Sequence, residues 1–432
     1  VYALLALFVG FIVMASELAM GRKTGQGAMG TYHALTKKFR WIGWLALFSP
    51  FAVMGFYAVL GGYCIEYMAL NLSNLAFGSE SLATGGELFA AMLSNPAGAV
   101  LFAALFLALC YLINRSGISG GIEKFNNVGM PTLFVMLVVI IIRSLTLPGA
   151  MEGLKFMFVP GYAVEAGFVA ETPSLLSVFA SAGGQMFFSL SLAMGAMITY
   201  GSYLQKKENL QKNAILIIVM DTLVALMAGL CVIPGRFALD PDGTLGGPKL
   251  LFITMQNVFS RMGGLGPIFG ILFYLLVVFA AVSSSISLLE VIVAHFVDKA
   301  RDAGKGDKRK AYTLIAAAAV GLGCILVCAD QLGGASFTPW KLLNLPETSI
   351  RMWNDCWLDF FDMLSEGVMM PFGALLMSLM IGWEVGPEMV KAECEQSGHA
   401  MGSYSFFKIC VKFITPLCMI LILYGQIKEF FF

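Results

Sequence analysis

Hydrophobic residues run along the chain in long blocks that are separated by short polar stretches. About 20 apolar residues cross the hydrocarbon core of a bilayer as a helix, so each block predicts one transmembrane helix. The blocks are too long for the strands of a closed barrel and lack the alternation that such strands need. We predict ten spans: roughly 1–20, 41–70, 97–113, 125–147, 174–203, 211–235, 266–297, 311–330, 360–384 and 405–427.

Three shorter stretches have a different pattern, with apolar and polar residues mixed at helical spacing. They cover 83–95, 150–158 and 248–262. Each is too short to span a bilayer, so we expect surface helices that lie over the bundle.

Composition agrees with this pattern. Of the 432 residues, 58% are hydrophobic and 12% are charged, whereas soluble domains carry about 25% charged residues. The chain is therefore an integral membrane protein. Its formal net charge of zero gives no reason to expect a nucleic-acid partner. The nine cysteines form no Cys-x-x-Cys pair and no Cys/His cluster, which indicates small buried apolar residues rather than metal ligands or disulfides.

Lysine and arginine set the predicted orientation. One set of alternate loops, which includes the cluster "DKARDAGKGDKRK" (298–310), holds 19 of the 27 positive charges. We predict that these loops face the cytoplasm of a bacterium and that the protein lies in its plasma (inner) membrane. Val1 then lies on the outer side. A parent protein with a cytoplasmic amino terminus needs one further helix before it, so ten spans here imply eleven in the parent.

Ionisable groups within predicted spans are costly and indicate function by default, and the acidic residues Glu17 and Asp221 are two of them. Glu17 lies near the cytoplasmic end of the first span, and a polar tie between two helices is the favoured interpretation. Asp221 lies near the middle of "IIVMDTLVALMAG", with no basic residue within a dozen positions on its outer side. Ion coordination and a buried protonated acid are both open for Asp221.

Two further stretches carry polar groups at membrane depth. In "FAAVSSSISLLE" three consecutive serines supply hydroxyl oxygens, which suit Na⁺, although serine also packs membrane helices closely. In "GGQMFFSLSLAMGAMITYGSY" (183–203), Gly183, Gly184 and Gly195 flank a segment with serines at mid-depth. Glycine-interrupted spans point to helices that unwind at a binding site, and simple helix packing is the alternative.

Two apparent catalytic signals carry little weight. "GISGG" (117–121) fits the G-x-S-x-G pattern but lies in a predicted loop between helices, with no strand before it. The three histidines, His33, His295 and His399, fall in or beside predicted cytoplasmic loops, far from any shared site. We therefore do not expect an enzyme.

Several motifs, in this order, resemble the neurotransmitter:sodium symporter family, in particular its bacterial amino-acid transporters. They are "ELAMGR" (17–22), "GGIEKFNNVGMPTLF" (120–134), "EGLKFMFVP" (152–160), "GQMFFSLSLAMGAMITYGSY" (184–203) and "FAAVSSSIS" (279–287).

The resemblance implies an all-α, LeuT-like inverted-repeat bundle that forms a single transmembrane domain over 1–432. The ten spans would be family helices two to eleven of the eleven-helix type. The family's first helix, with its "NxWRFPY"-like signature, is missing, and Tyr2 resembles the tyrosine that ends that region. That helix supplies much of the family's binding site. The alternative is therefore that the chain is an inactive or regulatory truncated homologue of the transporters.

The resemblance also assigns two sodium sites. Ser189 and Asp221 would contribute to the first, and Ala280, Ser283 and Ser284 to the second. Asp221 stands where members usually have asparagine, near the chloride ion of chloride-dependent members, and it could supply that negative charge itself. Gln185 lies beside the same place. A serine that binds chloride in dependent members is replaced by Ala225, so chloride should not be required.

A substrate pocket, two gates and a release motif follow from the same resemblance. The substrate residues would be Val53, Tyr57, Phe188, Ser191, Met194, Ser284 and Leu288, with Tyr57 and Phe188 as an aromatic lid. Asp362 resembles the outer-gate acid, with Asp359 as its rival. Both gate acids would have lost the arginine partners that the missing amino-terminal part supplies. Asp298 resembles the inner-gate acid and Tyr203 a tyrosine near it. Gly121 and Pro131 resemble a motif at which the fifth helix of some members unwinds.

The function implied is secondary active transport by alternating access. Two Na⁺ ions would enter together with a neutral, hydrophobic, possibly aromatic, L-amino acid, because Val53, Met194 and Leu288 give an apolar pocket wall. The partners are this substrate and the lipid bilayer. A sodium-coupled transporter of a solute other than an amino acid is a further alternative.

Overall fold

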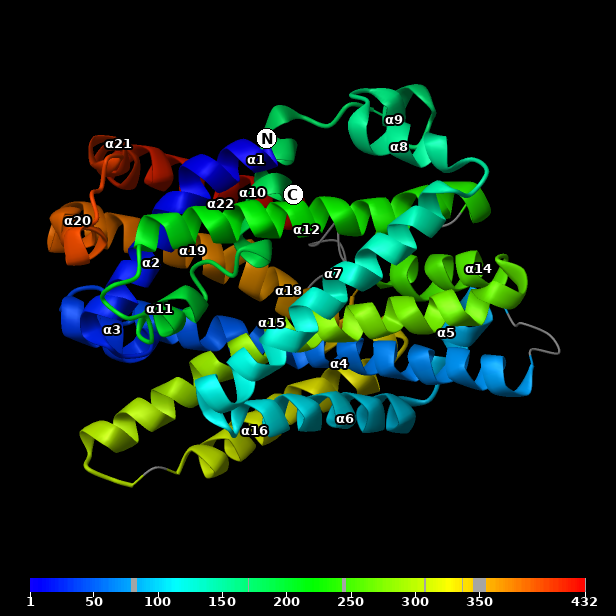
Figure 1. The fold of residues 1–432 in the computed structure, drawn as a ribbon, viewed down its shortest axis with the longest axis horizontal. Coiled ribbons are helices and arrows are strands. Elements are labelled where there is room, and N and C mark those ends of the chain that lie inside the picture. The colour runs from blue at the N-terminus through cyan, green and yellow to red at the C-terminus, as the bar shows by residue number, and fades with distance from the viewer. Residues whose placement is uncertain are drawn as a thin grey trace.

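The computed structural model describes residues 1–78, 84–169, 171–242, 246–306, 308–335, 337–344 and 355–431. Within these ranges every regular element is helical, as the sequence predicted (Figure 1). Residue 307 of the basic cluster 298–310 lies outside the described residues.

Nine helices of the described part are long and apolar enough to cross a membrane. Each coincides with a predicted span, and the observed ends differ from the predicted ones by up to seven residues. Three of them are single helices: α4 (Ile42–Phe77), α6 (Pro96–Asn114) and α12 (Leu210–Leu239). Three consist mostly of one helix: Ile118–Leu145 ends in α7 (Glu123–Leu145), Gly263–Asp302 is mostly α15 (Gly266–Asp302), and Arg309–Gly333 is mostly α16 (Arg309–Asp330). The other three contain two labelled helices each: Tyr2–Thr24 has α1 (Tyr2–Leu5) and α2 (Phe11–Thr24), Trp357–Val385 has α18 (Trp357–Asp362) and α19 (Met370–Leu379), and Tyr404–Lys428 has α21 (Tyr404–Ile409) and most of α22 (Thr415–Phe431).

The tenth predicted span, 174–203, is a helical pair. It consists of the apolar α10 (Leu175–Ser189) and the short α11 (Ala196–Gly201), with six non-helical residues between them. A side-chain oxygen of Ser174 caps α10 by accepting a hydrogen bond from the Ser177 amide.

Surface helices occupy all three predicted positions. They are α5 (Gly85–Leu93), α8 (Ala150–Phe158) and the segment Gly247–Ser260, which ends in α14 (Met255–Ser260). In α5 the sequence sets the helix start, because Thr84 and Glu87 form a capping box. Shorter helices complete the described chain: α3 (Ala28–Leu35), α9 (Tyr162–Glu165), α13 (Gly247–Lys249), α17 (Pro339–Leu343) and α20 (Glu388–Cys394).

The centre of the bundle is built on α4 and α15, which run beside each other over much of their length. Small residues let the helices around them approach closely. A Cβ atom at Gly62 of α4 would lie only 2.6 Å from the Ala103 nitrogen of α6. In a membrane such close packing replaces the hydrophobic effect as the force that holds helices together.

The two ends of the bundle differ in charge. The end that carries α3, α20 and the turn between α15 and α16 holds Lys37, Lys38, Lys206 and Lys207, and we call it the basic end (left in Figure 1). α5, α8, α9 and α14 lie at the opposite end.

Candidate functional site

The break between α10 and α11 lies where the sequence predicted an interrupted helix. α10 ends at Ser189 and α11 begins at Ala196. Between them Ser191, Ala193 and Gly195 have φ angles of 52°, 58° and 76°. Residues other than glycine seldom adopt positive φ, and such strain tends to gather at binding sites.

The glycines of this stretch have two different roles. At Gly195 the φ angle is left-handed, and an added Cβ would lie 2.8 Å from the Ala28 Cβ and 3.0 Å from the Ala46 carbonyl oxygen. Gly183 and Gly184 lie inside α10, where they pack against Ile422 and Gln426 of α22. The break therefore depends on Gly195, whereas the other pair are helix-packing glycines.

Glu17 fixes the broken segment in place. Its Oε2 accepts a hydrogen bond of 3.2 Å from the Ala193 amide, and its side chain is fully buried. Its Oε1 is buried as well and has no hydrogen-bond partner among the described residues. Glu17 is thus a tie between α2 and the break, which agrees with the interpretation favoured from the sequence.

We expect Glu17→Ala to destabilise the protein by about 1–3 kcal/mol, because the buried Ala193 amide then loses its acceptor. Glu17→Gln retains an acceptor oxygen at nearly the same place and should cost less. Thermal unfolding of both variants in detergent measures the difference. Equal melting temperatures for the two variants would contradict this role.

Asp221 on α12 meets two hydroxyl groups from other helices. Ser189 Oγ at the end of α10 donates a hydrogen bond of 2.6 Å to Asp221 Oδ2, and Tyr2 Oη of α1 donates to the same oxygen at 3.3 Å. No lysine or arginine of the described chain forms an ion pair with Asp221. The structure therefore brings a carboxylate without a cationic side-chain partner to the end of a broken helix.

All seven residues proposed for substrate binding line one cavity of about 250 Å³. Gln185, Ser189 and Asp221 line it too. The rings of Tyr57 and Phe188 lie with their centroids 6.3 Å apart, tilted by 58°. Side chains from α4, α10, the break, α12 and α15 are thus brought together, although they are spread over more than 230 positions of sequence.

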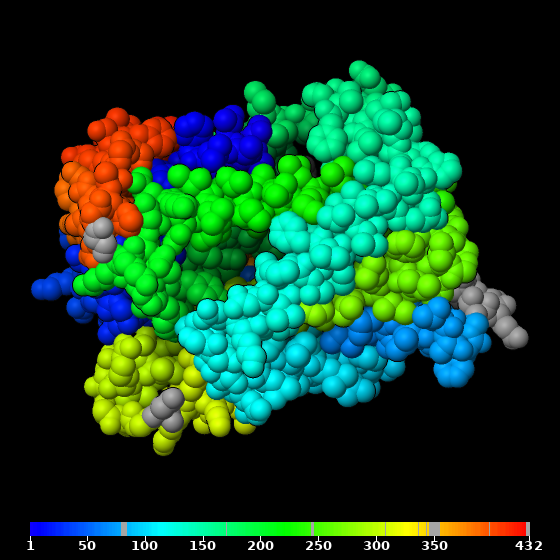
Figure 2. All heavy atoms as spheres, viewed as in Figure 1, coloured from blue at the N-terminus to red at the C-terminus, as the bar shows by residue number. Residues whose placement is uncertain are grey.

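A second cavity of about 420 Å³ adjoins the first, with Ser191 and Ser284 lining both. It extends past Tyr200 and Leu204 toward the basic end, and Asn126 of α7 and Asn213 of α12 line its sides. The space-filling view is hollowed between α7 and α12 (Figure 2).

The serine triplet lies on α15 between these cavities, and α15 is a continuous helix there. Ser283 Oγ donates to the Ala280 carbonyl oxygen at 2.8 Å, and Ser287 Oγ donates to the Ser283 carbonyl oxygen at 3.0 Å. Tyr200 of α11 and Ser287 are joined by a hydroxyl–hydroxyl bond of 2.5 Å. The triplet therefore adjoins α11, and Ser283 and Ser284 line the second cavity.

Comparison with known proteins decides the family. The model of the sodium:neurotransmitter symporter family matches residues 93–344, which is more than half of the chain. The chain belongs to this family. It is a sodium-dependent symporter of a multi-pass membrane family.

Related transporters align with almost the whole length of the symporter. An uncharacterised sodium-dependent transporter of Bacillus subtilis, YhdH, is 32% identical over 98% of this chain and 88% of its own length. A similar transporter of Haemophilus influenzae is 29% identical with the same coverage. The crystal structure of MhsT in complex with L-phenylalanine has a TM-score of 0.82, is 29% identical and matches 98% of this chain and 90% of that chain. The predicted LeuT-like fold is confirmed.

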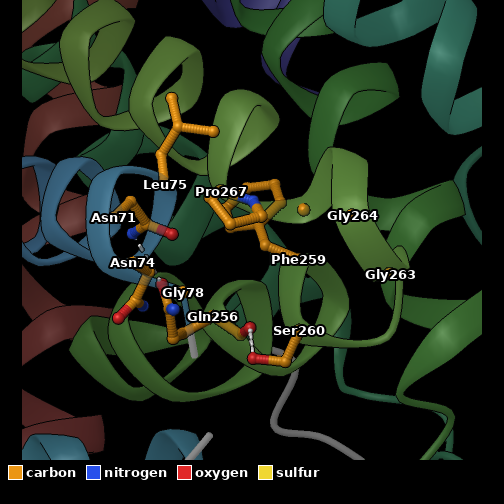
Figure 3. A pocket seen from close by; sticks show the side chains of 11 residues that line it. Asn71, Asn74, Leu75, Gly78, Gln256, Phe259, Ser260, Gly263, Gly264 and Pro267 are labelled. Carbon is orange, nitrogen blue, oxygen red and sulfur yellow. Dashed lines mark hydrogen bonds between the residues drawn. The ribbon is translucent and has the colours of Figure 1, made fainter. Parts of the chain in front are cut away.

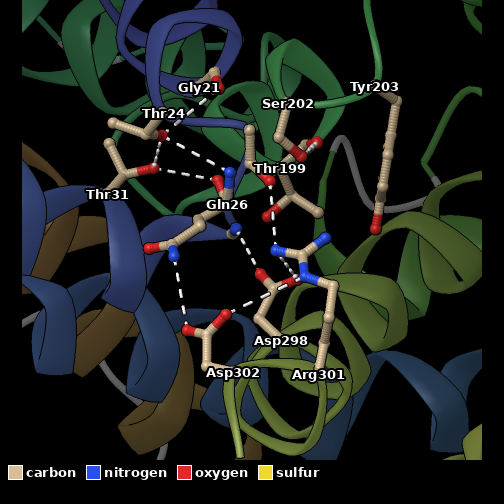
Figure 4. A network of polar contacts seen from close by, with 12 residues as sticks. Gly21, Thr24, Gln26, Thr31, Thr199, Ser202, Tyr203, Asp298, Arg301 and Asp302 are labelled. Carbon is tan, nitrogen blue, oxygen red and sulfur yellow. Dashed lines mark hydrogen bonds and ion pairs between the residues drawn. The ribbon is translucent and has the colours of Figure 1, made fainter. Parts of the chain in front are cut away.

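The candidate inner-gate acid of the symporter, Asp298, lies near the end of α15 with two partners (Figure 4). Its Oδ2 accepts a 2.7 Å hydrogen bond from the Gly27 amide, and its Oδ1 pairs with Arg301 at 3.0 Å. Arg301 also donates to the Gly25 carbonyl oxygen, at 3.4 Å. Asp298 therefore has a local arginine partner, because Arg301 lies one helical turn away on the same face of α15.

Tyr203, the candidate tyrosine near that gate, forms a hydrogen bond with Glu290. Its hydroxyl donates to Glu290 Oε1 at 2.8 Å. Glu290 is fully buried, forms an ion pair with Arg309 and lies near Asn114. The Tyr203 hydroxyl thus joins a network of α15, α16 and α6 that centres on the buried Glu290.

Asp362, the candidate outer-gate acid, lies at the end of α18 without an ion-pair partner among the described residues. Its electrostatic neighbours are two further carboxyls, Asp359 and Glu366. Asp359, the rival candidate, lines a separate cavity together with Phe89 and Pro248, at the end of the bundle opposite the basic end.

The candidate release-motif residues lie in the turn Ile118–Ile122 and in α7, which follows it. Gly121 is in a π-helical turn, Ile118–Ile122, where an added Cβ would collide with the Ile113 carbonyl oxygen. α7 then passes through Pro131 as a continuous helix. In this structure the helix is therefore wound at Pro131, and the irregular geometry is confined to the turn around Gly121.

Two residues next to the site were not singled out for it from the sequence. Tyr2 contributes a hydroxyl to Asp221, but its position at the start of an apolar run gave no functional signal. Glu366 lies in "MLSEGVMM", on the helix that carries Asp362, and faces Gly184 of α10. A carboxyl within a predicted span was the available signal for Glu366.

Proposed function

We propose that the protein is a sodium-coupled symporter that imports a neutral, hydrophobic L-amino acid. One observation carries the proposal: the seven candidate substrate residues line a single cavity, and Ser189 and Asp221 line the same cavity. A substrate and a sodium ion held there would be neighbours. Adjacency of this kind lets each ligand stabilise the bound state of the other.

The wall of the cavity supports a hydrophobic substrate. Val53, Met194 and Leu288 are buried and apolar. Among the described residues that line the cavity, Asp221 is the one with a charged side chain. A charged substrate side chain would lack a counter-charge at the apolar wall, and burying an unpaired charge is costly. The similar protein MhsT was crystallised in complex with L-phenylalanine, which is a neutral, hydrophobic amino acid.

Two sodium sites are proposed beside the cavity. Ser189 and Asp221 would contribute oxygens to the first, and the Ala280 and Ser283 carbonyls with the Ser284 hydroxyl to the second. These are hard oxygen donors that suit Na⁺. Because Asp221 brings its own negative charge, chloride is not needed in this proposal.

Alternating access would use the break. The two cavities meet at Ser191 and Ser284, so a small movement of α10 and α11 against α4 and α15 would connect the substrate to one side or the other. We further propose that the basic end faces the cytoplasm of a bacterial plasma membrane, because positive charge collects on that side.

Uptake of labelled amino acids into proteoliposomes tests this function. The full-length protein is assayed with a panel of neutral, acidic and basic amino acids, with Na⁺ or K⁺ outside and with chloride or gluconate. We expect uptake of hydrophobic amino acids that requires Na⁺ but not chloride. Uptake that is indifferent to Na⁺ would sink the proposal. Absence of all amino-acid uptake would favour an inactive homologue, or a transporter of another solute if Na⁺ binding persists.

Met194→Ala should change which substrates are taken up. Met194 is almost fully buried on the cavity wall, and each methylene of contact in an apolar pocket is worth about 1–3 kcal/mol. We expect at least a tenfold rise in KM for leucine and a smaller rise for alanine, measured by competition uptake. Met401→Ala is a matched control, because Met401 is also buried but does not line the cavity. An unchanged leucine-to-alanine ratio would remove Met194 from the pocket.

A further inference from the structure

A separate cavity lies at the opposite end of the bundle, between α4, α14 and the start of α15 (Figure 3). Its volume is about 300 Å³. Amide side chains line one part of it and glycines another. The residues lining it are Asn71, Asn74, Leu75, Gly78, Gln256, Phe259, Ser260, Gly263, Gly264, Gly266 and Pro267.

This cavity is distinct from the transport site. The two lining sets share no described residue. Asn71 follows Tyr57 by 14 positions on the same helix, and a rise of 1.5 Å per residue separates their backbones by about 21 Å. A ligand in one cavity therefore does not touch a ligand in the other.

Two buried amides are directed into the cavity with unused hydrogen-bonding capacity. Asn71 and Gln256 are each 1% exposed. Asn71 Nδ2 donates to the Tyr67 carbonyl oxygen at 2.8 Å and to Gln256 Oε1 at 3.1 Å. Asn71 Oδ1 and Gln256 Nε2 have no hydrogen-bond partner among the described residues. An amide pair that leaves one acceptor and one donor free is costly to bury unless a ligand or water completes it.

The chemistry of the lining restricts the ligand. No acidic, basic or histidine side chain is among the described lining residues, so a charged ligand would be desolvated without a counter-charge. A pure hydrocarbon would leave Asn71 and Gln256 unpaired. A hydroxyl group is neutral, and its oxygen both donates and accepts hydrogen bonds. It therefore forms hydrogen bonds with both Asn71 Oδ1 and Gln256 Nε2.

The remaining walls suit a ring with apolar edges. Pro267 and the exposed Leu75 present apolar surface next to the buried Phe259, while Gly263 and Gly264 carry no side chains and leave room. Ser260 and Asn74 add polar groups on the amide side. A sugar ring has this same division, with hydroxyl groups at its rim and C–H groups on its faces.

We propose that this cavity binds a neutral sugar of hexose size, either free or as the headgroup of a glycolipid. Leu75 lines it with an exposed side chain that is available to a lipid chain, and the exposed Leu265 lies between the lining residues Gly264 and Gly266. The site joins α4 and α15 to α14, the helix that precedes α15. A bound sugar would therefore fasten α14 to the central helices.

Saturation-transfer NMR with methyl β-glucoside tests the proposal on the full-length protein in nanodiscs of phosphatidylethanolamine and phosphatidylglycerol. We expect transfer to the ring protons of the glucoside. Gln256→Leu removes the free donor, and Gly264→Leu fills the cavity. A Cβ at Gly264 meets no atom within 4 Å, so the second variant should fold normally. Both variants should reduce the signal at least fivefold.

Controls separate the possible outcomes. Gly246→Leu is the matched control, because Gly246 also has open space around it but does not line this cavity. Nanodiscs that contain glucosyl-diacylglycerol identify the source: displacement of the glucoside supports a glycolipid, and lack of displacement supports a free sugar. No transfer with the unmodified protein, or equal transfer with Gln256→Leu and Gly264→Leu, would overturn the proposal. Transfer to acetamide but not to the glucoside would also overturn the proposal.

Discussion

Replacing Asp221 with asparagine is expected to raise the Na⁺ concentration for half-maximal uptake at least tenfold in chloride-free buffer. The carboxylate accepts hydrogen bonds from Ser189 and Tyr2 and has no cationic side-chain partner in the described chain. Two opposite unit charges 4 Å apart attract by about 4 kcal/mol at an effective dielectric constant of 20. Asparagine retains the hydrogen bonds but loses that attraction.

Chloride provides the decisive control for this prediction. If Asp221 supplies a negative charge that an anion can replace, chloride should restore part of the Na⁺ affinity of Asp221→Asn and leave the unmodified protein unaffected. Glu152→Gln is the matched control, because Glu152 is an exposed carboxylate paired with Lys155 far from the cavity. Unchanged Na⁺ affinity of Asp221→Asn without chloride would show that Asp221 has no part in sodium binding.

Gly195→Ala is expected to abolish most uptake and to lower the melting temperature. A left-handed backbone costs an alanine about 1–2 kcal/mol. In addition, the new Cβ would lie 2.8 Å from the Ala28 Cβ and 3.0 Å from the Ala46 carbonyl oxygen, so α3 or α4 must shift. That shift displaces Met194 and α11, which line the two cavities. We expect at least a tenfold loss of the initial uptake rate.

A glycine-to-alanine substitution at another position separates the loss of uptake expected for Gly195→Ala from any general effect of replacing glycine with alanine. Gly402 has ordinary φ and no atom within 4 Å of an added Cβ, so Gly402→Ala should transport normally. Uptake and thermal unfolding are measured for both variants at equal protein amounts in proteoliposomes. If Gly195→Ala transports at the unmodified rate, the left-handed turn at Gly195 is not needed for the transport cycle.

The helices were predictable because a bilayer imposes one rule on all of them. A span must be long and apolar, and its backbone must bond to itself, so runs of hydrophobic residues mark each helix. The ends were less predictable. α4 was expected to end near residue 70 but continues to Phe77, since a helix can extend beyond the hydrocarbon where lipid no longer restricts its composition.

The site was partly predictable for a different reason. Polar side chains at membrane depth are costly and glycine can interrupt a helix, so Ser191, Asp221 and Gly195 stood out in their apolar surroundings. Gly183 and Gly184 gave the same signal as Gly195 but pack against α22. A glycine that permits a left-handed turn and one that permits close packing look alike in a sequence, because both simply lack a side chain.

The sequence by itself determined the membrane class, the positions of the spans and the polar residues that interrupt them, because these depend on composition within one segment. The tertiary structure decided which of these residues meet. It joined Tyr2 and Ser189 to Asp221, gave Asp298 the Gly27 amide as a partner, and placed Asn71 beside Gln256 at the end of the bundle opposite the basic end. Such contacts depend on how helices far apart in the chain pack against each other, and no local pattern of residues encodes that geometry.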